Sequence, residues 1–421
     1  MKYFLTIILF WGLQANAFSQ DFVQHYRDGI AAYENQDFDG YLHHFQKSDS
    51  LRPNHRVLLY HLAKAYALNK QPEKAFEVLK YRAGFYALDD FSGENDFSIL
   101  GDSGLLDELI NLINKTSEAK KSSETVFEVD IPGFHAEGIA FHHQMKRFFL
   151  TDIRNGLIYS VGFEGDNLRK ELDLKEFGYW SALGIKFDPQ NENQLWVTTA
   201  AMENFERYDD SLSGRSAVLN FDINNGKLLK KYEIEGNHVF GDLIFSEDGS
   251  IIISDSGEPT LYRISNEREE IMEFISSPEW WNLQGIALSE SKKMVFVSDY
   301  ITGIYRIDLE TKEVKAVSER NELLRGADGI YLKGDTLIML QNGTSPKRVA
   351  SLTLTDSGMG ITSSINFPDN ALEELDEPTL GVLMGSELYY IANSPWAHYS
   401  QEGEPILENW KPIRINKLSI K

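Results

Sequence analysis

The sequence contains no cysteine among its 421 residues. This absence excludes disulfide bonds, thiol nucleophiles, cysteine-bound zinc and a cysteine-anchored lipid. Basic residues are also few: 41 lysines and arginines stand against 64 acidic residues, a formal net charge of −23. Because nucleic-acid binding depends on basic side chains that neutralise phosphates, this balance argues against a nucleic-acid partner. Apolar runs long enough to span a membrane are absent from the sequence.

The most apolar segment of the chain stands at its N-terminus. Lys2 is followed by the apolar run Phe4–Leu13 and then by the small residues Ala15 and Ala17. A basic start, a short apolar core and a small-x-small exit are typical of a secretory signal peptide, whereas an anchor or core helix is the alternative interpretation. We therefore predict a signal peptide over residues 1–19 and a periplasmic or secreted protein.

Residues 21–117 follow a helical periodicity. One apolar stripe is formed by Leu59, Leu62, Ala63 and Tyr66, and a second helical run starts after Pro72. With the small residues repeated at a shift of about 34 positions, the stretch 21–88 resembles two tetratricopeptide repeats. The resemblance implies paired helices that either bind a protein or peptide partner or cap the next domain. A further helical stretch follows over Leu105–Ile113, and a polar linker is expected over 118–125.

Beyond residue 126 the sequence repeats a unit of two short apolar strands. Each copy has a small or acidic residue, a Gly-Ile or similar pair, a strand, a polar turn and a second strand, and the copies start near 138, 184, 242, 285, 329 and 379. Further strands lie between the copies, and four strands in roughly 45 residues make one propeller blade. We predict a mainly β fold, a six-bladed β-propeller over 126–421, preceded by the α-helical domain. Five or seven blades are the alternatives.

The innermost strand of each blade lines the axis of a propeller. The residue before each Gly-Ile pair should therefore point to the axis at one face, and these residues are Glu137, Leu183, Gly241, Gln284, Asp328 and Pro378. Two carboxylates and one amide at a common point suit a hard divalent cation, Ca²⁺ first and Mg²⁺ or Mn²⁺ next, with Zn²⁺ also considered. The alternative is a polar channel mouth that binds only water.

The order of these motifs resembles the gluconolactonase and senescence-marker-30 (SMP-30) family over about 130–421. The resemblance implies a divalent metal on the propeller axis, with Glu137 and Asp328 as ligands and Asp328 also as the general base. Gln284 stands where the family has a metal-binding asparagine. Gly241 and Val239 stand where it has a substrate-contacting asparagine and, often, an arginine.

Further candidates lie near the blade openings. A substrate-binding role is considered for His238, Asp242, Trp180, Trp281 and Trp396, and a proton-shuttling role for His238 and His135. The strand-ending aspartates Asp152, Asp255 and Asp299 are expected to bond turn amides within their blades. The adjacent histidines His43 and His44 point in different directions on a helix and form a poor chelate.

Two hypotheses of different class follow. The first is a secreted, metal-dependent hydrolase of a small lactone or ester, with Asp328 as the catalytic base. The alternative is a non-catalytic binding or scaffold protein of the cell envelope, whose helical repeats dock a partner.

Overall fold

The computed structural model describes residues 17–91, 93–265, 270–291, 293–318, 323–355, 358, 360–400 and 403–420. It forms two compact units, Met1–Thr116 and Ser117–Lys421. The predicted signal peptide lies outside the described residues except for positions 17–19. Within the described ranges, no helix has both the length and the hydropathy needed to cross a membrane.

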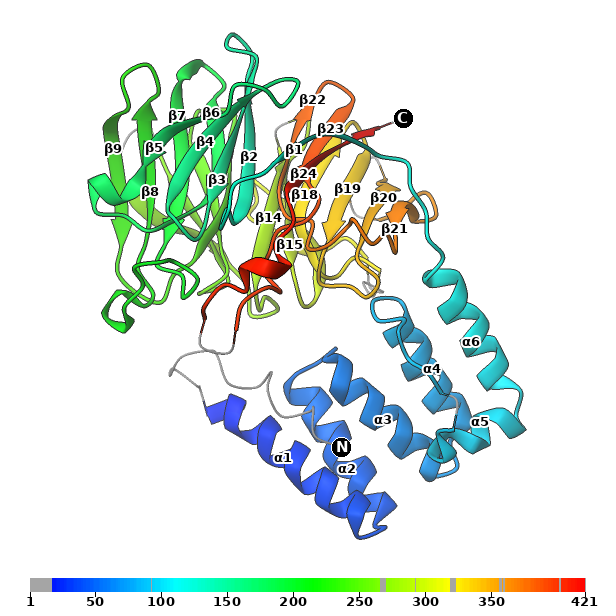
Figure 1. Ribbon diagram of the computed structural model, residues 1–421. Helices are drawn as coiled ribbons and strands as arrows, with labels where there is room; N and C mark the ends of the chain where they lie inside the picture. The colour runs from blue at the N-terminus through cyan, green and yellow to red at the C-terminus, as the bar shows by residue number, and fades with distance from the viewer. Residues whose placement is uncertain are drawn as a thin grey trace. The chain divides into compact units, whose positions relative to one another are not determined.

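The first unit is helical (Figure 1). Its helices are α1 (Ala17–Glu34), α2 (Phe38–Leu51), α3 (Arg56–Leu68), α4 (Pro72–Ala83), α5 (Ser98–Asp102) and α6 (Leu105–Thr116). Local chemistry marks the helix starts: Asp37 caps α2 by accepting a bond from the Gly40 amide, and Pro72 opens α4 with its preset φ. The helices α1 to α4 are joined by short turns, and α6 covers the helical stretch expected near its position.

A close approach between α1 and α2 organises the N-terminal end of this unit. A Cβ added at Gly29 on α1 would lie 2.6 Å from a ring carbon of Phe45 on α2. Because Gly29 has no side chain, the backbone of α1 can pack directly against the ring of Phe45 on α2. Phe45 is fully buried together with Tyr41, Leu58 and Ala65, so this contact belongs to the core of the unit.

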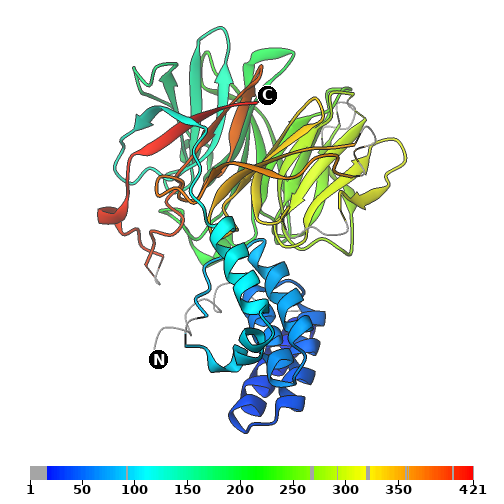
Figure 2. The ribbon, with the colours of Figure 1, turned by 90° about the vertical axis from the view of Figure 1, so that its right-hand side faces the viewer.

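The second unit is a six-bladed β-propeller (Figures 1 and 2). Within the described residues, six four-stranded antiparallel sheets form. Blade 1 holds β2–β5 (Ala136–His142, Arg147–Asp152, Leu157–Gly162, Arg169–Asp173), blade 2 holds β6–β9 (Ser181–Asp188, Asn191–Ala200, Ser216–Asp222, Lys227–Ile234), and blade 3 holds β10–β13 (Phe240–Phe245, Ile251–Asp255, Thr260–Ile264, Ile271–Ser276). Blade 4 holds β14–β17 (Leu283–Leu288, Met294–Asp299, Gly303–Asp308, Val314–Ala316), and blade 5 holds β18–β21 (Ala327–Lys333, Thr336–Gln341, Arg348–Thr353, Asn366–Asn370).

Blade 6 joins the two ends of the propeller. It is built from β22–β24 (Gly381–Met384, Glu387–Ile391, Ile413–Ser419) together with β1 (Glu124–Val129), which pairs with β24. The first and last strands of the propeller thus close the ring, so the blades leave few sheet edges unpaired. Both the number of blades and the N-terminal helical region agree with the sequence prediction.

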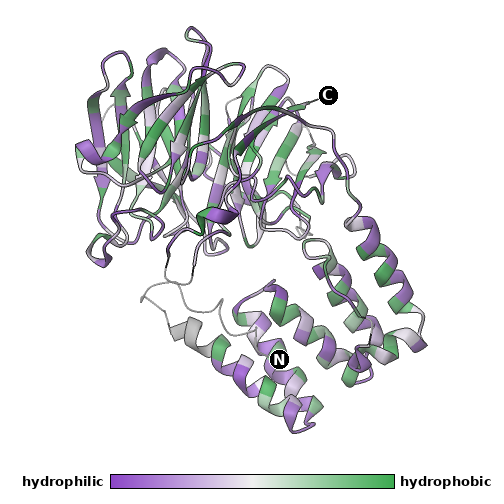
Figure 3. Cartoon of the chain, in the orientation of Figure 1, coloured by the Kyte–Doolittle hydropathy of each residue, from purple (hydrophilic) through white to green (hydrophobic). Residues whose placement is uncertain are grey.

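Apolar side chains from facing sheets fill the space between neighbouring blades. One such cluster joins Phe149 and Ile158 of blade 1 to Ile185, Val197 and Leu219 of blade 2. Figure 3 shows hydrophobic residues, in green, recurring along the strands of the propeller. Packing of these faces stabilises the ring without disulfides, in keeping with the absence of cysteine.

The segment expected to be a linker, 118–125, is bound to the propeller. Lys120 pairs with Asn370 by two backbone hydrogen bonds, and the amides of Ser122 and Ser123 donate to Asp369 Oδ1 at 2.7 and 3.0 Å. Strand β1 then begins inside the segment, at Glu124. The polar stretch is therefore part of the propeller unit rather than a free connection.

Glycine allows the inner strands to meet at the hub. A Cβ at Gly138, Gly184 or Gly285 would lie 2.3, 2.4 or 2.4 Å from a backbone carbonyl oxygen of the next blade. Any larger residue would force the strands apart, which explains the recurrence of Gly in the repeated motif. Blade 3 carries Asp242 at this position instead, so a carboxylate enters the hub there.

A β-bulge follows at the same place in five blades. The register between the first two strands shifts between Ala136 and Ile139 in blade 1, and equivalent shifts occur in blades 2, 3, 4 and 5. Bulges re-aim side chains and often border functional sites. Here they fall on the residues before the Gly-Ile pairs, which are thereby turned toward the axis.

Candidate functional site

An acidic cavity of about 320 Å³ opens at the propeller axis and adjoins a smaller one of about 80 Å³. Three of the predicted axial residues, Glu137, Gln284 and Asp328, line both cavities. The other lining residues of the larger cavity are Tyr300, Asn342, Glu377, Trp396 and Ala397. Those of the smaller one are Leu183, Met202, Val239, Gly241, Asp242, Ser256, Gly285, Leu380 and Trp396. Glu137 and Asp328 therefore line the same cavity, although they are almost two hundred positions apart in the chain.

Glu137 is held by blade 6. Trp396 Nε1 donates a hydrogen bond to Glu137 Oε2 at 3.0 Å, and the Glu137 backbone carbonyl accepts one from Thr379 Oγ1 at 2.9 Å. His135 lies behind the indole, with its ring centroid 4.5 Å from that of Trp396, and its Nδ1 is bonded to the Tyr399 hydroxyl. Burial lowers the pKa of His135 to about 3, so the ring is neutral and supports Trp396 rather than exchanging protons.

Asp328 is held by a short chain of polar contacts. Asn342 Nδ2 donates to Asp328 Oδ2 at 2.8 Å, and the Tyr300 hydroxyl donates to Asn342 Oδ1 at 2.9 Å. These bonds fix one carboxylate oxygen and orient the other. The arrangement suits a base that must keep a defined direction toward the cavity.

Gln284 presents its carbonyl to the cavity. Its Nε2 donates to Asn282 Oδ1 at 2.7 Å, which assigns the amide nitrogen to that bond and leaves Oε1 as the cavity-facing acceptor. A Cβ at Gly241 would lie 3.7 Å from this Oε1. The glutamine therefore supplies an oxygen of the kind that hard cations prefer.

The two central carboxylates are unfavourable when both are charged. Burial, and then the charge of Asp328, raise the pKa of Glu137 well above its ordinary value. Burial likewise raises the pKa of Asp328 to about 7, although the bond from Asn342 acts in the opposite direction. A cation between them would remove this cost, because opposite charge stabilises the ionised forms.

Glu377 is a third carboxylate at this cavity that the sequence analysis did not identify. Its Oε1 lies 2.6 Å from Lys347 Nζ, which also bonds Asp376 at 2.7 Å. Burial raises the pKa of Glu377 despite the opposing charge of Lys347. Its backbone φ is 57°, a left-handed conformation that costs a non-glycine residue about 1 kcal/mol or more. Strain of this kind is common where a side chain must point into a site.

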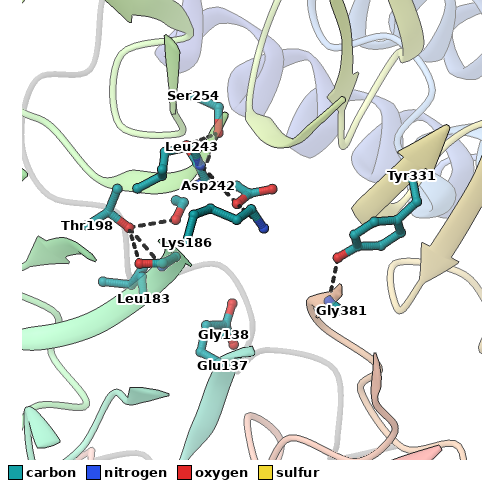
Figure 4. Close-up of polar contacts among 12 residues, drawn as sticks. Glu137, Gly138, Leu183, Lys186, Thr198, Asp242, Leu243, Ser254, Tyr331 and Gly381 are labelled. Atoms are coloured by element: carbon teal, nitrogen blue, oxygen red, sulfur yellow. Dashed lines mark hydrogen bonds and ion pairs between the residues drawn. The ribbon is translucent and has the colours of Figure 1, made fainter. Parts of the chain in front are cut away.

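Asp242 has a different partner. Its Oδ1 lies 3.3 Å from Lys186 Nζ and accepts a bond from the Leu243 amide at 2.9 Å (Figure 4). On the opposite side of the hub the Tyr331 hydroxyl accepts a bond from the Gly381 amide (Figure 4). Burial, followed by the charge of Asp242, raises the pKa of Tyr331 well above its ordinary value, so the phenol stays protonated.

Three predicted candidates, His238, Trp180 and Trp281, are not among the residues that line the two cavities. His238 is buried and its Nδ1 bonds Asp255 Oδ2 at 2.7 Å, so it supports its own blade. Trp180 packs on the core between blades 1 and 2, and Trp281 is 44% exposed. Of the three tryptophans considered, Trp396 lines the cavities.

The strand-ending aspartates hold turns, as expected. Asp255 Oδ1 accepts bonds from the amides of Val239 and Gly257 at 2.8 Å each. Asp299 Oδ1 accepts from the amides of Ile301 and Thr302 at 2.9 and 2.8 Å. Asp152 accepts comparable bonds in blade 1, including one from the Asn155 amide at 3.2 Å.

The sixth blade departs from the expected register. The sequence analysis placed Pro378 at the axis, whereas Glu377 and Leu380 line the cavities. The backbone carbonyl that approaches Gly329 belongs to Thr379. Thr379 therefore takes in blade 6 the position that the residue before the Gly-Ile pair takes in the other blades. Because β22 is short, the repeat pattern is too weak there to fix the alignment from sequence.

A simple signal identifies other lining residues. Ser256, Tyr300 and Asn342 each stand directly after the last residue of the second strand in blades 3, 4 and 5. The chain leaves the second strand at the same face where the first strand enters. The residue after the strand-ending position could thus have been added to the candidate list from sequence.

Comparisons with known proteins agree with this fold. No protein-family model matches the chain, and no curated protein matches it. Among solved structures, the calcium-binding protein regucalcin from Agrobacterium tumefaciens is similar with a TM-score of 0.50 and 12% identity, over 72% of this chain and 94% of that one. A gluconolactonase from Xanthomonas campestris has a TM-score of 0.47 and 13% identity over 70% and 89%.

A lyase has a comparable similarity. A catalytically inactive virginiamycin B lyase from Staphylococcus aureus, solved with quinupristin, has a TM-score of 0.45 and 14% identity over 71% of this chain and 99% of that one. At these identities the comparisons establish the six-bladed propeller fold alone. Because a fold by itself does not determine a function, the function has to be argued from the site.

Proposed function

We propose that this protein is a metal-dependent hydrolase of the gluconolactonase type, acting on a small lactone or ester outside the cytoplasm. The observation that carries the proposal is the charge balance at the axis. Four carboxylates surround it, and two of them, Asp242 and Glu377, have lysine partners. The remaining pair, Glu137 and Asp328, carries two negative charges when ionised, the complement of one divalent cation.

The donor set fits such a cation. Glu137, Asp328 and Gln284 supply oxygen atoms only, and among the described lining residues none is lysine, arginine or histidine. Oxygen ligands of this kind favour Ca²⁺, Mg²⁺ or Mn²⁺ over softer metals. Regucalcin, which shares the fold, is described as calcium-binding, and this supports Ca²⁺ as the first ion to test.

A cation held there supplies polarisation of the substrate carbonyl and a more acidic water. Asp328 accepts the proton of the attacking water, with Asn342 and Tyr300 keeping its second oxygen in position. Trp396 holds Glu137 in place through its indole N–H and adds an apolar wall for the ligand.

The substrate side of the cavity differs from the family pattern. Gly241 and Val239 line it where the family has polar residues, so this side offers space rather than hydrogen bonds. The substrate is therefore expected to have an apolar or bulky portion on that side. The signal-peptide prediction supports a periplasmic or secreted location.

The second candidate function is a non-catalytic binding protein of the cell envelope. It is favoured by the missing polar contacts at Gly241 and Val239 and by the helical hairpins of the first unit, which resemble partner-binding repeats. In this case the cation would shape a binding site, and the helices would dock a peptide.

One set of measurements tests the proposal. Purified protein is analysed for bound metal, and its thermal unfolding is followed with EDTA and with added Ca²⁺, beside Glu137→Gln and Asp328→Asn. We expect the native protein to hold one more ion per chain than either variant does, and to lose more stability in EDTA than either variant. Exposed Asp335, in the turn of blade 5, provides the matched control Asp335→Asn, which should behave as the native protein.

A panel of lactones and esters is then assayed. Turnover that requires metal and is lost in Asp328→Asn supports the hydrolase. Metal binding without turnover favours the binding protein, and the absence of metal together with indifference to EDTA would overturn the metal-dependent function.

A further inference from the structure

A second cluster of metal-ligating side chains lies in the helical unit, far from the propeller axis in the sequence. His25 and Asp28 stand on α1 and His44 stands on α2, and one ligand atom of each lies within 4.8 Å of the other two. All three side chains are half-buried, so they are positioned yet reachable. We propose that they form a binding site for a late first-row divalent ion, with Zn²⁺ as the best match.

The distance between the two imidazoles supports the site. His25 Nδ1 and His44 Nδ1 are 3.0 Å apart. Two ligands of one tetrahedral zinc ion, each at about 2.0–2.1 Å from the metal, are separated by about 3.3 Å. The histidine pair is therefore within a few tenths of an ångström of chelating geometry.

Without a metal, the contact at 3.0 Å is an N–H···N hydrogen bond between the two rings. A direct bond requires one ring to carry its proton on Nδ1 and the other to leave Nδ1 bare. When both rings carry the proton on Nε2, two lone pairs face each other across 3.0 Å. A cation that binds both lone pairs makes this second arrangement favourable, and neutral imidazole is a ligand that suits zinc and its neighbours.

The backbone explains why the three residues converge. Asp28 follows His25 by three positions, which places both on one face of α1. The next residue, Gly29, permits the close approach to α2, since a Cβ there would lie 2.6 Å from Phe45 and 3.3 Å from His44 Cβ. The close helix contact and the ligand cluster are thus parts of one arrangement.

The chemistry separates this cluster from the axial cavity. Two nitrogens and one carboxylate select a borderline metal, whereas the axial oxygens select a hard one. Three protein ligands leave a fourth position for water or for a group from a partner. Bound metal would tie α1, the first described helix, to α2.

The experiment uses full-length protein without a polyhistidine tag, in a Glu137→Gln/Asp328→Asn background that silences the axial site. Titration calorimetry with ZnCl₂ should give one ion per chain. His25→Ala and His44→Ala should lose more affinity than the roughly 10–100-fold that removal of an outer-shell partner costs. Asp28→Asn should weaken binding while leaving the helices folded, as checked by far-UV circular dichroism.

His43 offers the matched control, because it neighbours His44 but is exposed on α2. His43→Ala should bind zinc like the parent. Zinc should also slow tryptic cleavage after Arg27, an exposed residue of α1 between the two ligands on that helix. Absence of zinc binding in the parent, or an equal loss in His43→Ala and His44→Ala, would overturn the proposal. Neither result bears on the hydrolase, since the axial site is silenced throughout.

Discussion

Replacing Asp328 by asparagine should stabilise the metal-free protein at alkaline pH. The reason is the cost of ionising a buried carboxyl beside other acids, which raises the pKa of Asp328 from its ordinary 3.8 to about 7. The folded state therefore holds this proton more tightly than the unfolded state does. Stability contributed by the protonated group is present at low pH and is lost as pH rises from about 4 through about 7.

The magnitude follows from the same shift. One pKa unit corresponds to about 1.4 kcal/mol, so the full shift is worth roughly 4 kcal/mol at pH 8. This value is an upper bound, because Glu137 shares the same protons and the two groups titrate together. Asparagine keeps an oxygen to accept the bond that Asn342 now donates to Asp328 Oδ2. The expected gain is therefore roughly 2–4 kcal/mol at pH 8, and it falls to at most about 1.6 kcal/mol at pH 5, where only the interval between pH 3.8 and pH 5 contributes.

The assay is urea unfolding of the native protein and Asp328→Asn in EDTA at both pH values, with Asp335→Asn as the exposed control. Adding Ca²⁺ should then stabilise the native protein and Asp335→Asn, but not Asp328→Asn, by about 2.7 kcal/mol when the ion is at 100 times its dissociation constant. A variant that is less stable than the native protein at pH 8, or a difference that does not change with pH, would refute the electrostatic reasoning.

Three further outcomes are expected from the contacts described above. Trp396→Phe removes the hydrogen bond to Glu137 Oε2 but keeps the apolar wall, so Ca²⁺ affinity measured by calorimetry should fall roughly 10–100-fold, and unchanged affinity would contradict this role. Gly285→Ala places a Cβ 2.4 Å from a backbone carbonyl of the next blade, so it should lower the free energy of unfolding in urea by about 1–3 kcal/mol or more. In the control Gly360→Ala, the added Cβ has its nearest neighbour at 3.4 Å, and the loss should be less than about 0.5 kcal/mol. Burial lowers the pKa of His61 from 6.5 to about 4, so the unfolded state takes up a proton at higher pH than the folded state does. The free energy of unfolding of the helical unit should therefore fall by about 2 kcal/mol between pH 7 and pH 5. A thermal melt followed by circular dichroism of the helices that is the same at both pH values would show that the effect is absent.

The sequence was informative where the repeat is regular. In blades 1, 2, 4 and 5 the Gly-Ile pairs stand at equivalent points of the inner strands, so a ring could be inferred, and with it a shared space for Glu137 and Asp328. The reason is steric: in these four blades the inner strand passes too close to the next blade for a Cβ, and the recurrence of glycine marks the hub. The β-bulge at this point turns the residue before each glycine toward the axis.

Residues outside that rule could not be assigned from the pattern. Glu377 lies before a short strand in the blade that departs from the repeat, and its orientation depends on a left-handed backbone. The partners of charged groups, such as Lys186 for Asp242, come from different blades and have no fixed spacing. The same holds for His25 and His44, which meet only because two helices pack closely.

Ring closure and assembly of the axial site depend on the same few residues. Blade 6 combines the last strands of the chain with β1, and blade 1 follows directly, so the seam between these blades joins the two ends of the propeller. At this seam Ser394 Oγ donates to the Ala136 carbonyl at 2.7 Å, and Thr379 Oγ1 and Trp396 Nε1 donate to the carbonyl and carboxylate of Glu137.

Glu137 is therefore oriented by bonds that exist only in the closed ring. Asp328 lies in blade 5, the neighbour of blade 6, and the bond that it accepts from Asn342 comes from within blade 5. One carboxylate of the pair is positioned locally and the other by closure. A cation between Glu137 and Asp328 requires both carboxylates in position, so its binding favours the closed ring. Because this coupling is reciprocal, closure of the ring must favour cation binding by the same free energy.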